Sequence, residues 1–404
     1  MAKLTIDKVG VRGKKVLTRV DFNVPVEGGK ITDDRRIEMA IPTIREVIER
    51  GGRCVLMSHM GRPKGKGFEG EHSLKIVAAR LSELLGKPVA FPSEDCVDAK
   101  AKAGVEAMKD GDVLLLENLR FHKAETDGDP DFAEKLASMG DIYCNDAFGA
   151  AHRDHASIVS AAKIMKEQGK LCVSGLLMAK EIRYLSEAMA HPQHPFVAVL
   201  GGAKVSDKIP AIERLLDVTD TILIGGAMAY TMLAALGRKV GDSRVEEDRL
   251  KDAKRILDKA AVAKCDLILP TDHVCAMQFA SDAADVKVFE GEIPEGWMGL
   301  DIGPSTQAKY SGIIEKAKMV VWNGPMGVFE WRKFGMGTET IADAMANATS
   351  NNGAITIVGG GDSAAAAEKF GVASKMSHVS TGGGASLELL EGKRFRSIEV
   401  LDDA

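Results

Sequence analysis

The stretch AITIVGGGDSAAAAEKF, residues Ala354–Phe370, decides how the rest of the chain is interpreted. Its β-branched run Ile355–Val358 predicts a strand buried on both faces. Three glycines, Asp362 and Ser363 follow, and an alanine run with strong helix propensity comes next. We expect a strand, a tight turn and a helix whose first amides lack intrahelical partners and favour a phosphate. The alternative is an ordinary turn in which Asp362 or Ser363 caps the helix.

The second half of the chain repeats this pattern. Five times a strand-like run ends in a glycine or Asn-Gly turn, and a helical pattern follows in most cases. The segments are PFVAVLGGAKVSDK (195–208), DTILIGGAMAYTMLAALG (220–237), MVVWNGPMGVFE (319–330), the opening stretch, and HVSTGGGASLELLEG (378–392). Ligands of open α/β sheets bind at the carboxyl ends of the strands, where these glycines lie.

The first half also alternates strands with amphipathic helices. The expected strands are Val16–Val24, Cys54–Ser58, Val113–Glu117 and Ile142–Asn145, and the expected helices are Ile37–Arg50, Leu74–Leu85 and Phe132–Met139. This alternation predicts βαβ units and a parallel sheet. A length of 404 residues suits two domains, and we place their junction at an amphipathic helix over Leu176–Ala190 that His191–Pro195 ends.

Composition limits the partners. A net charge of −5 gives no overall attraction to nucleic acid or to an anionic membrane, so anionic ligands need local basic clusters. The start MAKLTIDKVG has no apolar signal region, and the apolar run Ile222–Leu236 is short for a membrane span and contains two glycines. The six cysteines form no CxxC pair, and we expect them to be buried free thiols rather than metal ligands or disulfides.

Basic side chains recur at the ends of the first-half strands. Strand alternation places Arg19, Asp21 and Asn23 on one face, and the later strand ends and the first helix add His59, Arg62, Arg120, His152, Arg153, His155 and Arg36. Guanidinium groups bind phosphate and carboxylate through paired hydrogen bonds. The set therefore predicts a site for a small, multiply anionic substrate. The histidines fit a general base, a phosphate donor or a capping contact.

Residues Ala354–Phe370 can be compared with two known phosphate-binding motifs. This stretch lacks the Lys-Ser/Thr ending of a Walker A loop. Gly359, Gly361 and Ala364 match the dinucleotide pattern GxGxxA, but no acid ends the next strand-like run, which weakens a dehydrogenase interpretation. Phosphates with a metal fit better, with Asp362 as the carboxylate for Mg²⁺. Lys204 and Lys208, four residues apart, reach one face if that segment is helical.

Together these motifs resemble the phosphoglycerate kinase family over essentially the whole chain. RVDFNVP, SHMGRP, ENLRF, NDAFGAAHR, GGAKVSDK, WNGPMGVFE, GGGDS and STGGGAS occur in the order of that family. The resemblance implies two doubly wound, mainly parallel α/β (Rossmann-like) domains that face each other across a cleft and close by hinge-bending. It implies a 3-phosphoglycerate domain (1–172), an interdomain helix (173–190), a nucleotide domain (191–388) and a C-terminal segment returning to the first domain (389–404).

The resemblance also assigns site residues. It implies that 3-phosphoglycerate is bound by Asp21, Asn23, Arg36, His59, Met60, Gly61, Arg62, Arg120 and Arg153. The nucleotide, ATP or ADP with Mg²⁺ on Asp362, would lie against Lys204, Lys208, Gly299, Asn323, Glu330, Gly360, Gly361, Asp362 and Ser363. The catalytic groups would be Arg36, Lys208, Gly360 and Gly361. Two positions depart from the family pattern: Ala150 replaces its usual threonine, and Ala227 its usual third glycine.

The implied reaction is reversible phosphoryl transfer between ATP and the carboxylate of 3-phosphoglycerate, a step of glycolysis and gluconeogenesis. We expect a cytoplasmic monomer with small-molecule substrates and neither nucleic-acid nor membrane partners. Two alternatives stay open at this point. One is a two-domain NAD-dependent dehydrogenase, and the other is a non-catalytic nucleotide-binding protein that kept the fold.

Overall fold

Two compact units make up the computed structural model, which describes residues 2–404 but not the side chains of Glu187 and Ala188. Unit 1 contains the chain up to Arg183 together with Arg394–Ala404, and unit 2 contains Tyr184–Lys393. These bounds differ by several residues from the domains expected from the sequence. The assignment of one substrate to each domain stays a prediction.

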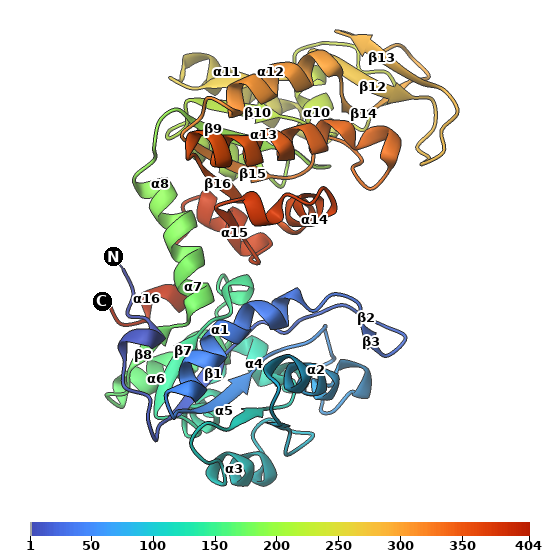
Figure 1. Cartoon of the computed structure of the whole chain (residues 1–404). Coiled ribbons are helices and arrows are strands. Elements are labelled where there is room, and N and C mark those ends of the chain that lie inside the picture. The colour runs from blue at the N-terminus through green and yellow to red at the C-terminus, as the bar shows by residue number, and fades with distance from the viewer. Residues whose placement is uncertain (1) are drawn as a thin grey trace. The chain divides into compact units, whose positions relative to one another are not determined.

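Unit 1 is built on a parallel six-stranded sheet (Figure 1). Its order is β5-β6-β4-β1-β7-β8, and every neighbouring pair is parallel. The strands are β1 (Lys15–Arg19), β4 (Arg53–Met57), β5 (Val89–Ala90), β6 (Val113–Leu115), β7 (Ile142–Asn145) and β8 (Cys172–Ser174). A two-stranded antiparallel hairpin, β2 (Val26–Glu27) with β3 (Lys30–Ile31), lies outside this sheet.

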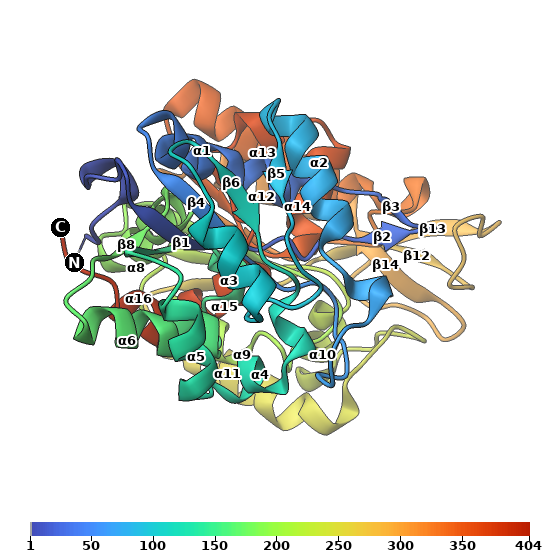
Figure 2. The ribbon, with the colours of Figure 1, turned by 90° about the horizontal axis from the view of Figure 1, so that it is seen from below.

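Helices cover both faces of this sheet because its strands carry apolar side chains on both sides. Figure 2 shows α1 (Arg35–Glu49) and α2 (Lys75–Leu85) on one side, and α3 (Ala99–Glu106), α5 (Pro130–Ala137) and α6 (Ala161–Glu167) on the other. The short helix α4 (Lys123–Asp127) precedes α5. Unit 1 is therefore doubly wound, as the sequence predicts.

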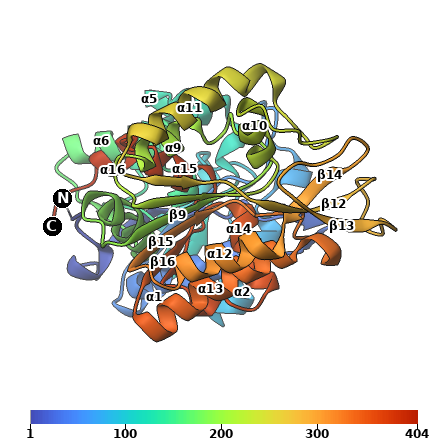
Figure 3. The same ribbon diagram turned by 90° about the horizontal axis from the view of Figure 1, so that it is seen from above.

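Unit 2 repeats the design. Its six parallel strands have the order β11-β10-β9-β15-β16-β17. They are β9 (Phe196–Leu200), β10 (Thr221–Ile224), β11 (Asp266–Ile268), β15 (Met319–Asn323), β16 (Ile355–Val358) and β17 (His378–Val379). Figure 3 shows α12 (Pro304–Ile314) and α13 (Met336–Asn352) on one face, and α9 (Ile209–Leu215), α10 (Met228–Ala235) and α11 (Leu250–Val262) on the other.

All five strand–turn segments of the second half are present. The opening stretch forms β16 and α14 (Gly361–Lys369), and the last segment forms β17 and α15 (Gly384–Leu390). The sequence did not predict the antiparallel sheet β13-β12-β14, which consists of β12 (Asp272–Ala276), β13 (Val286–Glu290) and β14 (Met298–Ile302). The described part of the chain contains no helix long and apolar enough to cross a membrane.

Each parallel sheet has one point at which its connections change direction. In unit 1, β1 leads to β4 on one side, while its other neighbour β7 leads to β8 on the opposite side. In unit 2, β9 leads to β10 while its neighbour β15 leads to β16. The connecting segments diverge there beyond the carboxyl ends of the strands, the position at which ligands bind in open α/β sheets.

Two predicted elements need correction. The strand expected over Val16–Val24 ends at Arg19, because beyond it the Phe22 amide donates to the Ser58 side chain instead of continuing the sheet. The expected helix over residues 176–190 is α7 (Leu176–Glu181), a π-helical segment (Ile182–Glu187) and α8 (Ala188–Ala190). The six cysteines are buried free thiols, as predicted.

The two ends of the chain meet in unit 1. Lys3 pairs with Asp403 at 2.8 Å, and the Cys172 amide at the start of β8 donates to Asp402 Oδ2 at 2.9 Å. Figure 1 shows the termini side by side, with α16 (Arg396–Glu399) close to them. Val400 and Leu401 complete the apolar core beneath α5 and α6. The last residues thus form part of the fold of unit 1.

Candidate active site

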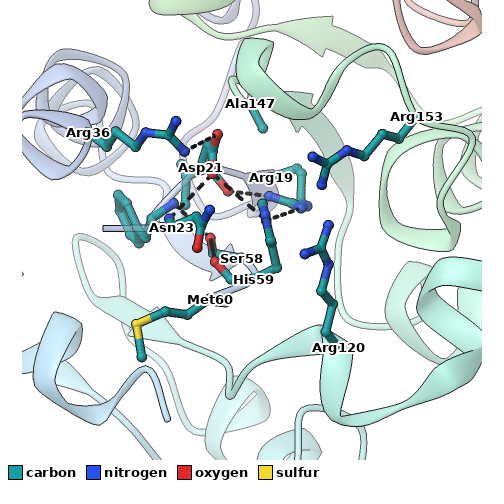
Figure 4. Close-up of polar contacts among 12 residues, drawn as sticks. Arg19, Asp21, Asn23, Arg36, Ser58, His59, Met60, Arg120, Ala147 and Arg153 are labelled. Atoms are coloured by element: carbon teal, nitrogen blue, oxygen red, sulfur yellow. Dashed lines mark hydrogen bonds and ion pairs between the residues drawn. The ribbon is translucent and has the colours of Figure 1, made fainter. Parts of the chain in front are cut away.

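A basic cluster lies at the switch point of the unit 1 sheet. Asp21 follows β1, and its Oδ2 accepts a hydrogen bond of 2.8 Å from Arg36 Nη1, which comes from the first turn of α1. His59, just after β4, places Nδ1 3.8 Å from Asp21 Oδ1 and is 3% exposed. Figure 4 shows these side chains converging. They meet through the loops that leave β1 and β4, and not through strand alternation as the sequence suggested.

Arg19 lies beneath this cluster and is fully buried. Its Nε donates to Ser157 Oγ at 2.9 Å, and its Nη2 contacts His59 Nδ1 at 3.1 Å. Because a guanidinium group has no acceptor, Nδ1 of His59 must accept, which leaves the ring proton on Nε2. Ser157 in turn donates to Glu125 Oε1 at 2.6 Å. Strand alternation predicts Arg19 on the same face as Asp21 and Asn23, whereas no sequence pattern indicates Glu125 or Ser157.

Arg120 and Arg153 extend the cluster from other strand ends. Figure 4 shows both guanidinium groups pointing toward the space next to His59 and Arg19. Arg120 Nη1 donates to the Gly61 carbonyl at 2.8 Å, while its buried Nε has no partner within the described residues. Arg153 Nε contacts His152 Nε2 at 3.3 Å. Arg62 is exposed on the loop that follows β4.

The cationic groups of this cluster are partly buried and repel one another. Burial, followed by the charges of Arg153 and Arg19, lowers the pKa of Arg120 to about 10. Burial and the surrounding guanidinium groups hold the pKa of His59 well below its usual value. They lower that of His155 to about 4. Cations that are kept this close favour a bound anion, which removes their repulsion.

The loop after β4 is held by buried polar contacts. The Gly61 amide donates to Asn23 Oδ1 at 2.8 Å, and the Met60 carbonyl accepts from Asn118 Nδ2 at 2.7 Å. Gly61 has φ +64°, and a Cβ there would lie 2.5 Å from His72 Nδ1. The structure thus brings together the substrate-binding residues that the sequence predicted in unit 1, with Arg62 at the rim.

The second candidate region surrounds the start of α14 in unit 2. Gly360 is the N-cap of this helix and has φ 92°, a backbone conformation that residues other than glycine rarely adopt. Ser363 is fully buried, and its Oγ accepts from the Gly324 amide at 2.6 Å. The alternative interpretation, in which Asp362 or Ser363 caps the helix, therefore does not hold. The first amides of α14 lack intrahelical partners, as in other phosphate-binding turns.

A pocket of about 360 Å³ opens in front of these amides. Among its lining residues are Lys204, Lys208, Asn323 and Gly360–Ser363. Lys208 Nζ donates to Asn323 Oδ1, and burial lowers the pKa of its ammonium to about 8. Helix α9 begins only at Ile209, so turns and not helical spacing bring both lysines to this pocket.

Two residues expected at the nucleotide site do not line this pocket. Gly299 lies in β14, where its amide donates to Ser243 Oγ at 2.9 Å and a Cβ would collide with the Tyr230 ring. Glu330 is exposed, and its carbonyl accepts from Lys369 Nζ at 3.0 Å. The pocket instead includes Gly383 and Gly384 at the start of α15, which the predicted site did not contain.

Asp362 fits a magnesium ligand. It is exposed in the first turn of α14, and its carboxylate makes no hydrogen bond within residues 2–404. A hard cation bound with a nucleotide usually takes one or two protein oxygens and keeps several waters. A single free carboxylate beside phosphate-binding amides meets that requirement.

The two departures from the family pattern occupy different surroundings. Ala150 is 1% exposed in a small apolar cluster with Ala147, Ile158 and Val159. Ala227 is partly buried at the start of α10, against the cluster that contains Tyr230. Neither change removes a charged group from the basic cluster or the pocket.

Known proteins similar to this chain identify its family. The phosphoglycerate kinase family model matches residues 6–393. The chain belongs to the phosphoglycerate kinase family. Curated phosphoglycerate kinases of Lactobacillus acidophilus and Chloroherpeton thalassium are 53% and 52% identical over the full length of both chains. Solved phosphoglycerate kinases of Coxiella burnetii and Pyrococcus horikoshii cover 98% of each chain, with TM-scores of 0.88 and 0.84 at 40% and 32% identity.

The family establishes the class of reaction. The chain is a phosphotransferase, a phosphoglycerate kinase by family, by named relatives and by structural neighbours. Neither the NAD-dependent dehydrogenase nor the non-catalytic nucleotide-binding protein is supported. The resemblance and the α/β fold class inferred from the sequence are thus confirmed.

Proposed function

We propose that the basic cluster of unit 1 binds 3-phosphoglycerate and that the pocket of unit 2 binds ATP or ADP. The observation that carries this proposal is the convergence of Arg36, Arg120, Arg153 and His59 at the carboxyl ends of the unit 1 strands (Figure 4). In agreement with it, burial and then neighbouring guanidinium groups lower the pKa values of Arg120 and His59. Several cations close together, with the Asp21 carboxylate beside Arg36 and His59, suit a substrate that carries both a phosphate and a carboxylate, because guanidinium groups bind both. The substrate-binding residues are Asp21, Asn23, Arg36, His59, Met60, Gly61, Arg62, Arg120 and Arg153.

Nucleotide binding would combine backbone and side-chain groups. The amides that begin α14 face the phosphates, and Lys208 supplies a cation on the same side. Lys204, Asn323, Asp362 and Ser363 line the same pocket. Gly299 and Glu330 stay in the proposal as more distant nucleotide contacts. Mg²⁺, held by Asp362, would neutralise charge on the phosphate oxygens when it is bound with the nucleotide.

The proposed chemistry needs no general base. The attacking carboxylate of 3-phosphoglycerate is ionised at neutral pH, so catalysis consists of positioning and charge stabilisation. Arg36, Lys208 and the amides of Gly360 and Gly361 stabilise the charge on the transferred phosphoryl group. His59 is neutral among its arginine neighbours and donates from Nε2 to a substrate oxygen.

Because donor and acceptor would bind to different units, transfer would require hinge-bending that brings the units together and excludes water. Small-angle scattering with both substrates tests this step, and an unchanged radius of gyration would contradict it. We further propose a cytoplasmic monomer acting in glycolysis, without nucleic-acid or membrane partners.

A coupled assay with 3-phosphoglycerate and Mg-ATP tests the proposed sites. Arg36→Ala should lower kcat by about 10²–10³, the usual cost of removing one preorganised charge-stabilising group. Arg35→Ala is the matched control, because the neighbouring Arg35 is exposed and pairs with Asp33 at 2.5 Å. Equal activity of the two variants would remove Arg36 from the mechanism.

A further inference from the structure

A second group of polar side chains in unit 1 lies outside the basic cluster. Asp95 and Cys96 lie on the loop between β5 and α3, and His122 follows the 3-10 turn Leu119–Phe121. One ligand atom from each of the three residues lies within 4.8 Å of the other two. Carboxylate, thiolate and imidazole are the ligand types of zinc sites in proteins.

The geometry of the pair Asp95 and His122 is that of two ligands of a common ion. His122 Nε2 lies 3.0 Å from Asp95 Oδ2, yet this buried nitrogen has no hydrogen-bond partner within the described residues. The two atoms are therefore close without the alignment that a hydrogen bond requires. Ligands of one metal ion are similarly close, because their lone pairs point to the ion and not to each other.

Cys96 supplies the third ligand. It is 1% exposed, and its Sγ makes no hydrogen bond within residues 2–404. The carboxylates of Asp95 and Glu125 bring negative charge near this sulfur, which favours a bound cation.

The surroundings hold these ligands in place. Asp95 Oδ1 accepts a hydrogen bond of 2.8 Å from the Val97 amide, which leaves Oδ2 for the ion. The His122 ring packs against Phe132 with 5.1 Å between ring centroids. Such outer contacts orient metal ligands. The Asp95 and His122 side chains are 38% and 29% exposed, so water can reach the fourth position of a tetrahedral ion.

We propose that Asp95, Cys96 and His122 form a site for a borderline-soft divalent cation such as Zn²⁺. Mg²⁺ prefers oxygen ligands in octahedral geometry, so this site is separate in position and chemistry from the proposed one at Asp362. The bound cation joins the loop before α3 to the segment that carries Arg120. That segment is also bonded to the loop after β4, because the Gly67 amide donates to the Phe121 carbonyl at 2.9 Å.

Co²⁺ is the probe for this site, because a cobalt–thiolate bond produces a near-ultraviolet charge-transfer band. Titration of the full-length protein, without substrates, should produce this band and saturate at a single equivalent. Cys96→Ala should abolish the band, and Asp95→Asn and His122→Gln should weaken Co²⁺ binding by roughly tenfold or more. Absence of the cobalt–thiolate band in the unaltered protein would overturn the proposal.

Two controls separate this site from others. Cys265→Ala removes a buried thiol of unit 2 that contacts Thr219 Oγ1 at 3.3 Å, and it should keep the band. Asp362→Asn should keep it too, because the site does not depend on the nucleotide pocket. A band that survives Cys96→Ala would place the thiolate elsewhere and contradict the assignment. If Cys96→Ala does not fold, His122→Gln provides the test instead, because this side chain is partly exposed. Unchanged Co²⁺ affinity of His122→Gln would also overturn the proposed site.

Discussion

The two candidate sites occupy equivalent places in their sheets but are built from different groups. In unit 1, side chains from the ends of several strands converge, and Arg36, Arg120, Arg153 and His59 supply the polar surface. In unit 2, backbone amides at glycine turns supply it, with Lys208 as a partly buried cation. The side-chain site should thus be sensitive to truncation, and the backbone site to any added side-chain atom. The following predictions test this contrast.

Gly360→Ala should have the largest effect of these variants. The residue has φ 92°, and an added Cβ would lie 3.2 Å from Asn323 Nδ2. Displaced amides should lower kcat/KM for ATP by roughly 100-fold, the cost of misplacing a catalytic group by about 1 Å. Gly312→Ala is the matched control, since this glycine of helix α12 lies outside the pocket and an added methyl there meets nothing within 4 Å. Steady-state kinetics in which both variants behave alike would contradict a backbone-built site.

Arg153→Lys should have the next largest effect, and on the other substrate. Lysine keeps the charge but loses the planar fork that binds phosphate or carboxylate through two hydrogen bonds. Loss of one charge-assisted hydrogen bond, about 1.5–3 kcal/mol, should raise KM for 3-phosphoglycerate by roughly 10- to 150-fold. KM for ATP should not change in the same assay. A rise in KM for both 3-phosphoglycerate and ATP would indicate a general structural defect and not the loss of a substrate contact.

The dependence of activity on pH should reveal the titration of Lys208 in unit 2. Burial lowers the pKa of Lys208 to about 8, so its charge is present below this pH and is lost as the pH rises through it. We expect kcat/KM for ATP to fall on the alkaline side with a midpoint near that value. Lys208→Arg keeps its charge to much higher pH and should lose this alkaline limb. If kcat/KM of Lys208→Arg still falls at alkaline pH with the same midpoint, a group other than Lys208 causes the fall.

The smallest effects should come from two buried serines. Ser157→Ala removes the acceptor of Arg19 Nε and the donor to Glu125, and Ser363→Ala removes the acceptor of the Gly324 amide. Each should lower the free energy of unfolding by about 1–3 kcal/mol, because a buried donor loses its partner. Urea titration followed by circular dichroism measures both.

The tryptophans separate the two serine variants. All three, Trp297, Trp322 and Trp331, lie in unit 2. Ser363→Ala should therefore shift the midpoint seen by tryptophan fluorescence, whereas Ser157→Ala should shift mainly the midpoint seen by circular dichroism. The reverse pattern would count against independent stabilisation of the two units.

Much of the fold could be predicted from local sequence. Strand Ile355–Val358, its glycine turn and the alanine-rich helix carry strong local signals, and each occurs as expected. The arginines and lysines of both sites were also predicted, because they follow strands whose carboxyl ends meet at one edge of a parallel sheet.

The remaining features depend on contacts between distant segments. Arg19 can be buried because Ser157 and His59, 138 and 40 residues further along the chain, contact its guanidinium nitrogens. The strand at Arg19 ends early because Phe22 finds the Ser58 hydroxyl, which no periodicity reveals. Helix α14 is capped by Gly360 because its positive φ forms the turn, although the adjacent Asp362 and Ser363 are the commoner capping residues.

Binding measured for each substrate alone tests the central claim most directly, that the two units hold different substrates. The experiment is calorimetric titration of Arg153→Lys with 3-phosphoglycerate and, separately, with Mg-ATP. We predict that Kd for 3-phosphoglycerate rises by about tenfold or more, equivalent to about 1.4 kcal/mol, while Kd for Mg-ATP equals that of the unaltered protein. An equal weakening of both ligands, or a loss of Mg-ATP binding alone, would contradict the account.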